Sequence, residues 1–295
     1  MDRGFLKSKI VHDYFRDPSA LVGSFIVMAF ILLALLAPWI APQNPYDLEQ
    51  VSLDDFLKPP IWVEGGQSPF LLGTDDQGRC ILSTILYGSR TSLIVAFGVV
   101  MLAGSFGVIM GMLAGYYGGT MDTVVMRLAD TLFSFSTALI AFLLLGLFKQ
   151  RGVLTVILAI CVADWVRYAR TMRGSVLEVK ELAYMVAAKA TGASDLRILL
   201  KHLLPNAIPP IFVIVAVDLA VVIMFEATLS FLGVGVRLTE PSLGMMISIG
   251  KDYVYAGMWW LVIFPGSALV VLVVGINLFA DWLREKLNPK IERGR

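Results

Sequence analysis

ELAYMVAAKATGASDLRILLKHLLPNAIPP, residues 181–210, is a polar, helix-prone stretch that lies between two long apolar runs. A glycine divides it, prolines gather at its end, and it carries charges at Glu181, Lys189, Asp195, Arg197 and Lys201. Charged side chains are costly in hydrocarbon, so such a stretch belongs outside a membrane that the flanking runs cross. It therefore predicts a helical membrane protein with a substantial loop between two of its spans.

The composition of the whole chain agrees with a membrane protein. Of 295 residues, 57% are hydrophobic and 16% charged, and the mean hydropathy is +0.77, whereas a soluble domain carries about 25% charged residues. The net charge of +1 argues against nucleic acid as a partner, and membrane lipid is the expected one. Because Cys80 and Cys161 lie far apart, neither a structural disulfide nor a metal site is expected.

Six apolar runs predict an all-α membrane protein with about six transmembrane helices. A helix needs about 20 apolar residues to cross about 30 Å of hydrocarbon. Prolines rather than a small-residue cleavage site follow the first run, which favours a retained helix over a cleaved signal. The predicted spans are 21–42, 92–115, 121–148, 153–173, 205–235 and 259–283.

The distribution of basic residues predicts the orientation. Most of the 24 lysines and arginines lie on the side of the N-terminus, and such residues favour the cytoplasm. Both termini and the loop 174–204 are therefore expected to be cytoplasmic. The chain divides into an N-terminal segment with the first helix (1–45), a periplasmic segment (46–91), a core membrane domain (92–284) and a cytoplasmic tail (285–295).

Turn residues in the outer segment, such as Pro59-Pro60 and Gly65-Gly66, predict an irregular folded cap. Within it, residues 79–90 predict a short amphipathic helix. Cys80 is expected to be open to an impermeant thiol reagent from the periplasmic side.

Small residues recur at every fourth position in the second predicted span, at Ala103, Gly107, Gly111, Gly115 and Gly119. This spacing places them on one helix face, where another backbone can approach closely. The pattern predicts tight helix packing, and a moving helix interface is the alternative.

Catalytic motifs are missing. The two histidines, His12 and His202, lie far apart, and residues 244–252 have the wrong glycine spacing for a phosphate loop. Asp252 stands where that motif needs serine or threonine. The chain is therefore expected to be noncatalytic, without a cofactor or metal, and unable to hydrolyse ATP by itself.

Four acidic residues fall inside predicted spans, where each should face protein or a water-filled path. The spacing of Asp164 and Arg167, and of Arg127 and Asp130, predicts two ion pairs within helices. Asp218 and Glu226 have no basic residue nearby in their own helix, so they are candidates for lining a pathway or for bonding between helices. Four scattered acids would also suit a proton-coupled carrier.

The loop 174–204 is predicted to be a helix–turn–helix knuckle. Gly192 ends the first helix in a left-handed turn, and Ser194 caps the second, with Asp195 in its first turn. The second helix should run to Leu204, and Pro205 should begin the next span. The knuckle can dock in the groove of a partner protein or lie flat on the membrane.

Five further stretches accompany the knuckle: DPSALVGSFIVMAFILLALLAPWIAP, LLGTDDQGRCILSTILYGSRTSL, GMLAGYYGG, FEATLSFLGVG and FADWLREKLNP. Together with AAKATG and LLPNAIPP they resemble the C-type permease subunit of dipeptide, oligopeptide and nickel ABC importers, over almost the whole chain. Val186 stands where the EAA loop of that family has glutamate. Cys80 and Ser136 replace its usual aspartate and proline.

The resemblance implies a type I ABC-importer permease in a bacterial inner membrane, with an ATPase-coupling loop at Met185, Val186, Ala187, Ala188, Gly192, Ala193, Leu204 and Pro205. It also implies a heterodimer with a homologous second permease, two ATP-binding subunits and a periplasmic substrate-binding protein. The substrate would be a di- or oligopeptide or a related small solute. A stand-alone secondary carrier or channel is the alternative, and a membrane enzyme ranks third.

Overall fold

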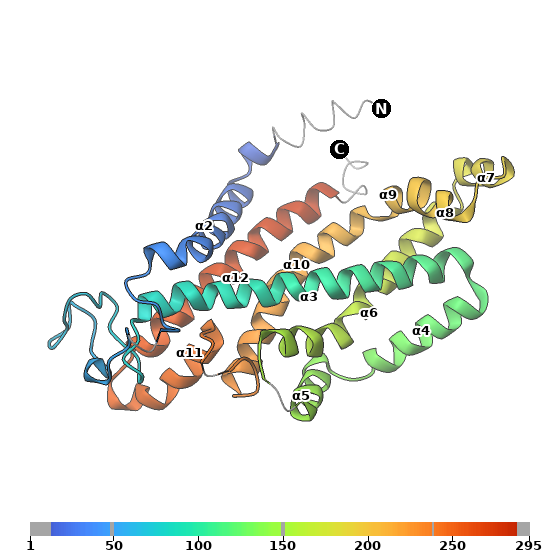
Figure 1. The fold of residues 1–295 in the computed structure, drawn as a ribbon. Helices are drawn as coiled ribbons and strands as arrows, with labels where there is room; N and C mark the ends of the chain where they lie inside the picture. The colour runs from blue at the N-terminus through green and yellow to red at the C-terminus, as the bar shows by residue number, and fades with distance from the viewer. Residues whose placement is uncertain (1–12, 48–49, 149–150, 238, 288–295) are drawn as a thin grey trace.

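The computed structural model describes residues 13–47, 50–148, 151–237 and 239–287, and within these ranges all the regular elements are helices (Figure 1). Before the core lie α2 (Pro18–Ile40) and the short η1 (Leu53–Asp55). The core comprises α3 (Ile81–Tyr117), α4 (Gly119–Phe133), α5 (Thr137–Leu147), α6 (Val153–Lys180), α10 (Pro209–Phe231), α11 (Leu243–Gly250), η3 (Lys251–Ala256) and α12 (Trp260–Leu287). Between α6 and α10 lie α7 (Ala183–Ala190), α8 (Asp195–Arg197), η2 (Ile198–Leu203) and α9 (Leu204–Ala207).

The all-α membrane fold predicted from the apolar runs is confirmed, although the spans are less uniform than expected. In the part of the chain that the structure describes, α2, α3, α10 and α12 are long and apolar enough to cross a membrane. The predicted third span is α4 and α5 together, which are bent by 87° at residues 134–136. The predicted fourth span is α6, whose middle carries the charged residues Asp164, Arg167 and Arg170.

The prediction of a separate amphipathic helix at 79–90 is wrong. These residues instead form the first turns of α3, which begins at Ile81 and continues without a break to Tyr117. No glycine pair or proline interrupts the chain over this range, so the helix propagates until Gly118, whose φ of +68° ends it.

The small-residue face of α3 packs against α6, which confirms the predicted tight packing. A Cβ on Gly111 would lie 2.9 Å from the Cα of Ala169, and a Cβ on Gly115 would lie 2.7 Å from a methyl group of Val176. A Cβ on Gly107 would lie 2.4 Å from the carbonyl oxygen of Trp165. Gly119 faces open space, so the close approach ends before it.

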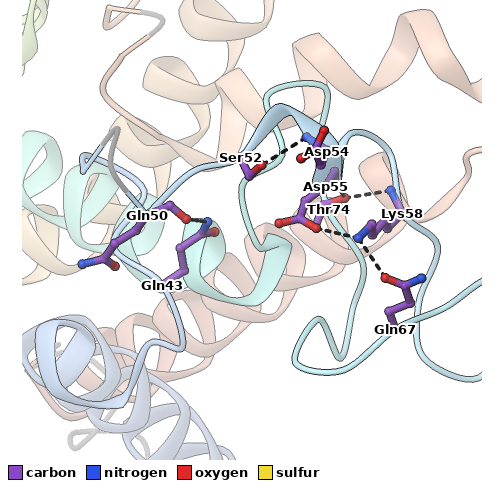
Figure 2. A network of polar contacts seen from close by, with 8 residues as sticks. All are labelled: Gln43, Gln50, Ser52, Asp54, Asp55, Lys58, Gln67 and Thr74. Atoms are coloured by element: carbon purple, nitrogen blue, oxygen red, sulfur yellow. Dashed lines mark hydrogen bonds and ion pairs between the residues drawn. The ribbon is translucent and has the colours of Figure 1, made fainter.

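The segment between α2 and α3 is an irregular cap held by polar contacts (Figure 2). Lys58 lies at its centre: its Nζ donates to Asp55 Oδ1 at 2.5 Å and to Gln67 Oε1 at 2.8 Å. Its backbone N–H donates to the hydroxyl of Thr74 at 2.7 Å. These bonds satisfy some of the polar groups of a segment that has little secondary structure of its own.

Cys80, expected to be open to an impermeant reagent, is fully buried at the junction of this cap with α3. Its backbone N–H donates to Gln43 Oε1 at 2.6 Å, and Thr74 pairs with it in an isolated bridge. The cap folds back over the start of α3, which hides a thiol that lies outside the predicted membrane core. The expectation of ready labelling is therefore wrong.

Candidate functional site

The knuckle between α6 and α10 begins with α7, and Gly192 ends that helix as predicted. Gly192 has a φ of +77°, and its N–H donates to the carbonyl of Lys189 at 3.1 Å. The N–H of Ala193 reaches the carbonyl of Ala188 at 3.3 Å. This pair of bonds is the Schellman arrangement, which requires a left-handed residue and therefore favours glycine.

The second arm of the knuckle differs from the prediction in two ways. Ser194 occupies the N-cap position but its side chain makes no capping hydrogen bond. The arm is not one regular helix to Leu204, because residues 198–203 form the π-helical turn η2 between α8 and α9. A π turn inserts an extra residue into the helix, and such turns are frequent at functional sites.

The predicted coupling residues divide between the interior and the surface of the knuckle. Met185 is buried, with 4% of its side chain exposed. Ala188, Ala193 and Leu204 are half-buried, and Val186, Ala187, Gly192 and Pro205 are exposed. Large apolar side chains are exposed beside them, at Leu182, Tyr184, Val186, Leu196 and Leu200. We call these five residues the knuckle patch.

A polar clasp connects the knuckle to the end of α3. The hydroxyl of Tyr116 donates to Asp195 Oδ1 at 2.6 Å, and Lys180 Nζ donates to the carbonyl of Tyr116 at 2.7 Å. Lys180 also lies over the Tyr116 ring, 5.8 Å from its centroid. Nothing in the local sequence distinguishes Tyr116 from the adjacent Tyr117, so its contact with the knuckle was not predicted.

Asp218 lies at the centre of a buried polar cluster that joins α6 and α10. It is 0% exposed and bonds to the guanidinium of Arg167, while the hydroxyl of Tyr168 donates to it at 2.8 Å. Arg167 also reaches Asp164 at 3.4 Å, in the pair that the spacing predicts. A carboxylate buried in this way needs such partners, because an unpaired charge in the interior is costly.

Glu226 lies two turns further along α10 and is also 0% exposed. Ser92 of α3 and Ser230 of α10 donate their hydroxyls to its two carboxylate oxygens, each at 2.7 Å. Glu226 thus bonds between helices in the structure. Ser92 had no distinguishing signal in the sequence, since it reaches Glu226 only through the packing of α3 on α10.

The predicted pair of Arg127 with Asp130 is wrong. Asp130 pairs instead with Arg170 of α6, at 2.6 Å. A second pair joins the same two helices, because Arg173 donates to both oxygens of Asp122, to Oδ2 at 2.6 Å. The arginines of α6 are placed opposite α4 by packing, and the i to i+3 spacing on α4 could not show that.

Across the described ranges, no three His, Cys, Asp or Glu side chains lie together in a way that could hold a metal ion.

Two family models match the chain. The model described as "Binding-protein-dependent transport system inner membrane component" matches residues 107–293, which include the knuckle and the buried acids. The model described as "N-terminal TM domain of oligopeptide transport permease C" matches residues 8–60, which include α2.

Several curated proteins are similar over nearly their whole length. The dipeptide transport system permease protein DppC of Haemophilus influenzae is 36% identical, over 95% of this chain and 94% of its own. The di/tripeptide transport system permease protein DppC of Pseudomonas aeruginosa is 34% identical, with 94% and 89% covered. The probable D,D-dipeptide transport system permease protein DdpC of Escherichia coli is 32% identical, with 97% and 92% covered.

The fold is also similar to that of a solved structure, an inward-facing conformation of the MetNI methionine ABC transporter. A chain of that structure is 19% identical with a TM-score of 0.56, and the match covers 70% of this chain and 96% of that one. At this identity the similarity concerns the fold alone.

Proposed function

Because the chain belongs to the family of binding-protein-dependent transport system inner membrane components, we propose that it couples solute import to ATP hydrolysis on separate subunits. The chain is a multi-pass permease of the bacterial inner membrane. In the proposed assembly it pairs with a homologous second permease, two ATP-binding subunits and a periplasmic substrate-binding protein. The relatives named for dipeptide transport support a di- or oligopeptide, or a related small solute, as the substrate.

The exposed knuckle patch is the observation that supports coupling most strongly. Val186 is 61% exposed and Leu196 is 67% exposed, although both side chains are apolar. Exposed apolar side chains of this kind fit the groove of a partner protein. We propose that the groove belongs to the ATP-binding subunit and that α7 fills it.

The clasp can transmit a movement of the ATP-binding subunit from the knuckle to the membrane helices. Asp195 lies in the second arm of the knuckle, and its bond to Tyr116 connects that arm to the end of α3. Since α3 packs along α6 through the glycine face, a displaced knuckle would carry both helices with it. Lys180, the last residue of α6, donates to the carbonyl of Tyr116 and so connects α6 to the end of α3 as well.

Replacing Val186 with aspartate tests the coupling role. The change places a charge in the proposed interface without touching the interior of the protein, because Val186 is exposed. Burial of an unpaired charge costs several kcal/mol, so we expect at least a tenfold loss of co-purified ATP-binding subunit and a matching loss of uptake. Membrane insertion should stay at the parental level.

Val186→Thr is the matched control, because threonine keeps the shape of valine and adds no charge. We expect it to retain both co-purification and uptake. If Val186→Asp retains both at parental levels, the knuckle does not dock in the ATP-binding subunit. Solute uptake by this chain alone, without ATP-binding subunits, would likewise refute the proposed function.

A further inference from the structure

A charged cavity of about 460 Å³ lies between α4 and α6. Ligand pockets for small molecules have volumes of about 300–1,000 Å³, so it is large enough for one small solute. Its lining combines three arginines and two aspartates with two uncharged residues: Asp122, Thr123, Met126, Arg127, Asp130, Arg170 and Arg173.

The five charged side chains are arranged unequally. Arg173 and Asp122 form a two-bond pair and are about a quarter to a third exposed, at 33% and 23%. Arg170 and Asp130 form a single close contact and are more open, at 37% and 60%. Arg127 has no ion-pair partner among the residues that the structure describes, and it is exposed. The cavity therefore has one fixed pair, one open pair and one free cation.

The open pair can exchange partners at small cost. An ion pair between exposed side chains contributes little to stability, because water solvates both charges well when they separate. Asp130 and Arg170, whose guanidinium also lies over the Phe133 ring at 4.3 Å from its centroid, are therefore available to a ligand that offers them an ammonium and a carboxylate group. Arg127 adds a second guanidinium on the same wall, and guanidinium groups bind carboxylates through paired, charge-assisted N–H bonds.

The break between α4 and α5 indicates what this wall faces. Residues 134–136 are not helical and are exposed, and they follow Asp130 by one turn. Irregular backbone at membrane depth is tolerated only where protein buries it or where it lines a water-filled cavity. Broken helices of this kind form solute sites in transporters. The exposed break therefore needs either a protein partner or water beside it, and the charged lining of the cavity, which ends one turn before the break, favours water.

We propose that this cavity binds a small zwitterionic solute, such as a peptide with free termini, on its passage through the permease. Arg127 and Arg170 bind the carboxylate of the solute, Asp130 accepts hydrogen bonds from its ammonium group, and the Arg173–Asp122 pair holds α4 against α6. An anionic lipid phosphate would also pair with the arginines, but it fits less well because it would leave Asp130 without a cationic partner. This inference rests on the proposed function, since it assumes that a solute passes along α4 on its way through the permease.

The test uses the assembled transporter in lipid nanodiscs, without its binding protein, so that only the permease selects the ligand. Thr123, which lines the cavity, is replaced by cysteine after Cys80 and Cys161 have been changed to alanine. The rate of maleimide labelling at position 123 is then measured against increasing concentrations of alanyl-phenylalanine. The same titration is made with N-acetyl-alanyl-phenylalanine amide, which carries neither terminal charge.

We expect alanyl-phenylalanine to protect position 123 and the blocked peptide to protect it at least tenfold less well, as the loss of charge-assisted bonds requires. Arg127→Gln should raise the half-protecting concentration about tenfold or more. Arg284→Gln, a change to an exposed arginine of α12, is the matched control and should leave it unchanged. Equilibrium dialysis of radiolabelled alanyl-phenylalanine against the complex with its native cysteines supplies an independent measurement.

Equal protection by both peptides, or no protection together with no binding in dialysis, would overturn the proposal. Protection that follows the phosphatidylglycerol content of the nanodisc instead of the peptide would make the cavity a lipid site and would also overturn it. Uptake by the complete system in proteoliposomes separates this inference from the function on which it rests. Uptake without protection refutes only the cavity, whereas absence of ATP-dependent uptake refutes the proposed function.

Discussion

Replacing Gly111 with alanine should destabilise the protein by about 3 kcal/mol, because α3 and α6 have no room for one more carbon. The new Cβ would lie 2.9 Å from both the Cα and the carbonyl carbon of Ala169, and still closer to its oxygen. Carbon atoms in favourable contact are about 3.5–4.0 Å apart, so the two helices would have to separate by about 1 Å. Overpacking of a well-packed core costs about 1–3 kcal/mol. A clash with backbone atoms should cost an amount near the top of this range, because the backbone, unlike a side chain, cannot relieve it by changing rotamer.

Gly174→Ala is the matched comparison, because Gly174 lies on α6 and a Cβ there meets nothing within 4 Å. Alanine is favoured over glycine inside a helix by up to about 1 kcal/mol, so this variant should be slightly stabilised. Unfolding of the purified protein by sodium dodecyl sulfate, followed by circular dichroism, measures both changes. A Gly111→Ala variant within about 0.5 kcal/mol of the parent, or a shift of both variants in the same direction, would show that α3 and α6 have room for the added carbon.

Glu226→Gln should assemble like the parent, because the amide oxygen still accepts from Ser92. Glu226→Leu should lower the yield of assembled complex, because leucine leaves the buried hydroxyl of Ser92 without an acceptor. Equal yields of the two variants would refute this expectation. Burial and the neighbouring Asp75 raise the pKa of Asp76 above its ordinary 3.8. The folded state therefore binds this proton more tightly, and stability should fall as pH rises from about 3.8 through the raised pKa. Asp76→Asn should remove this loss of stability with rising pH, measured as the melting temperature at a series of pH values. An unchanged pH dependence would contradict the expectation. In a cysteine-free background, an impermeant maleimide should label Glu64→Cys in intact spheroplasts and Lys189→Cys only after lysis; the reverse pattern would overturn the topology.

The fold class and the knuckle could be predicted because their causes are local. A run of about 20 apolar residues crosses hydrocarbon whatever its neighbours are. Gly192 ends α7 because a left-handed φ suits glycine. The glycines of α3 likewise line up on one face by helical period alone, which predicts that some backbone approaches closely, although it does not tell which one.

What lies opposite each side chain was decided only by the tertiary structure. Asp130 is three residues from Arg127 and yet pairs with Arg170, because α6 packs beside α4. The thiol of Cys80 is hidden because the outer segment folds over it. The break at 134–136 contains no proline or glycine and was not predicted; there the hydroxyl of Ser134 donates to the carbonyl of Asp130 at 2.8 Å. Sequence spacing reports neighbours on one helix, whereas ion pairs, burial and cavities depend on how different helices pack together.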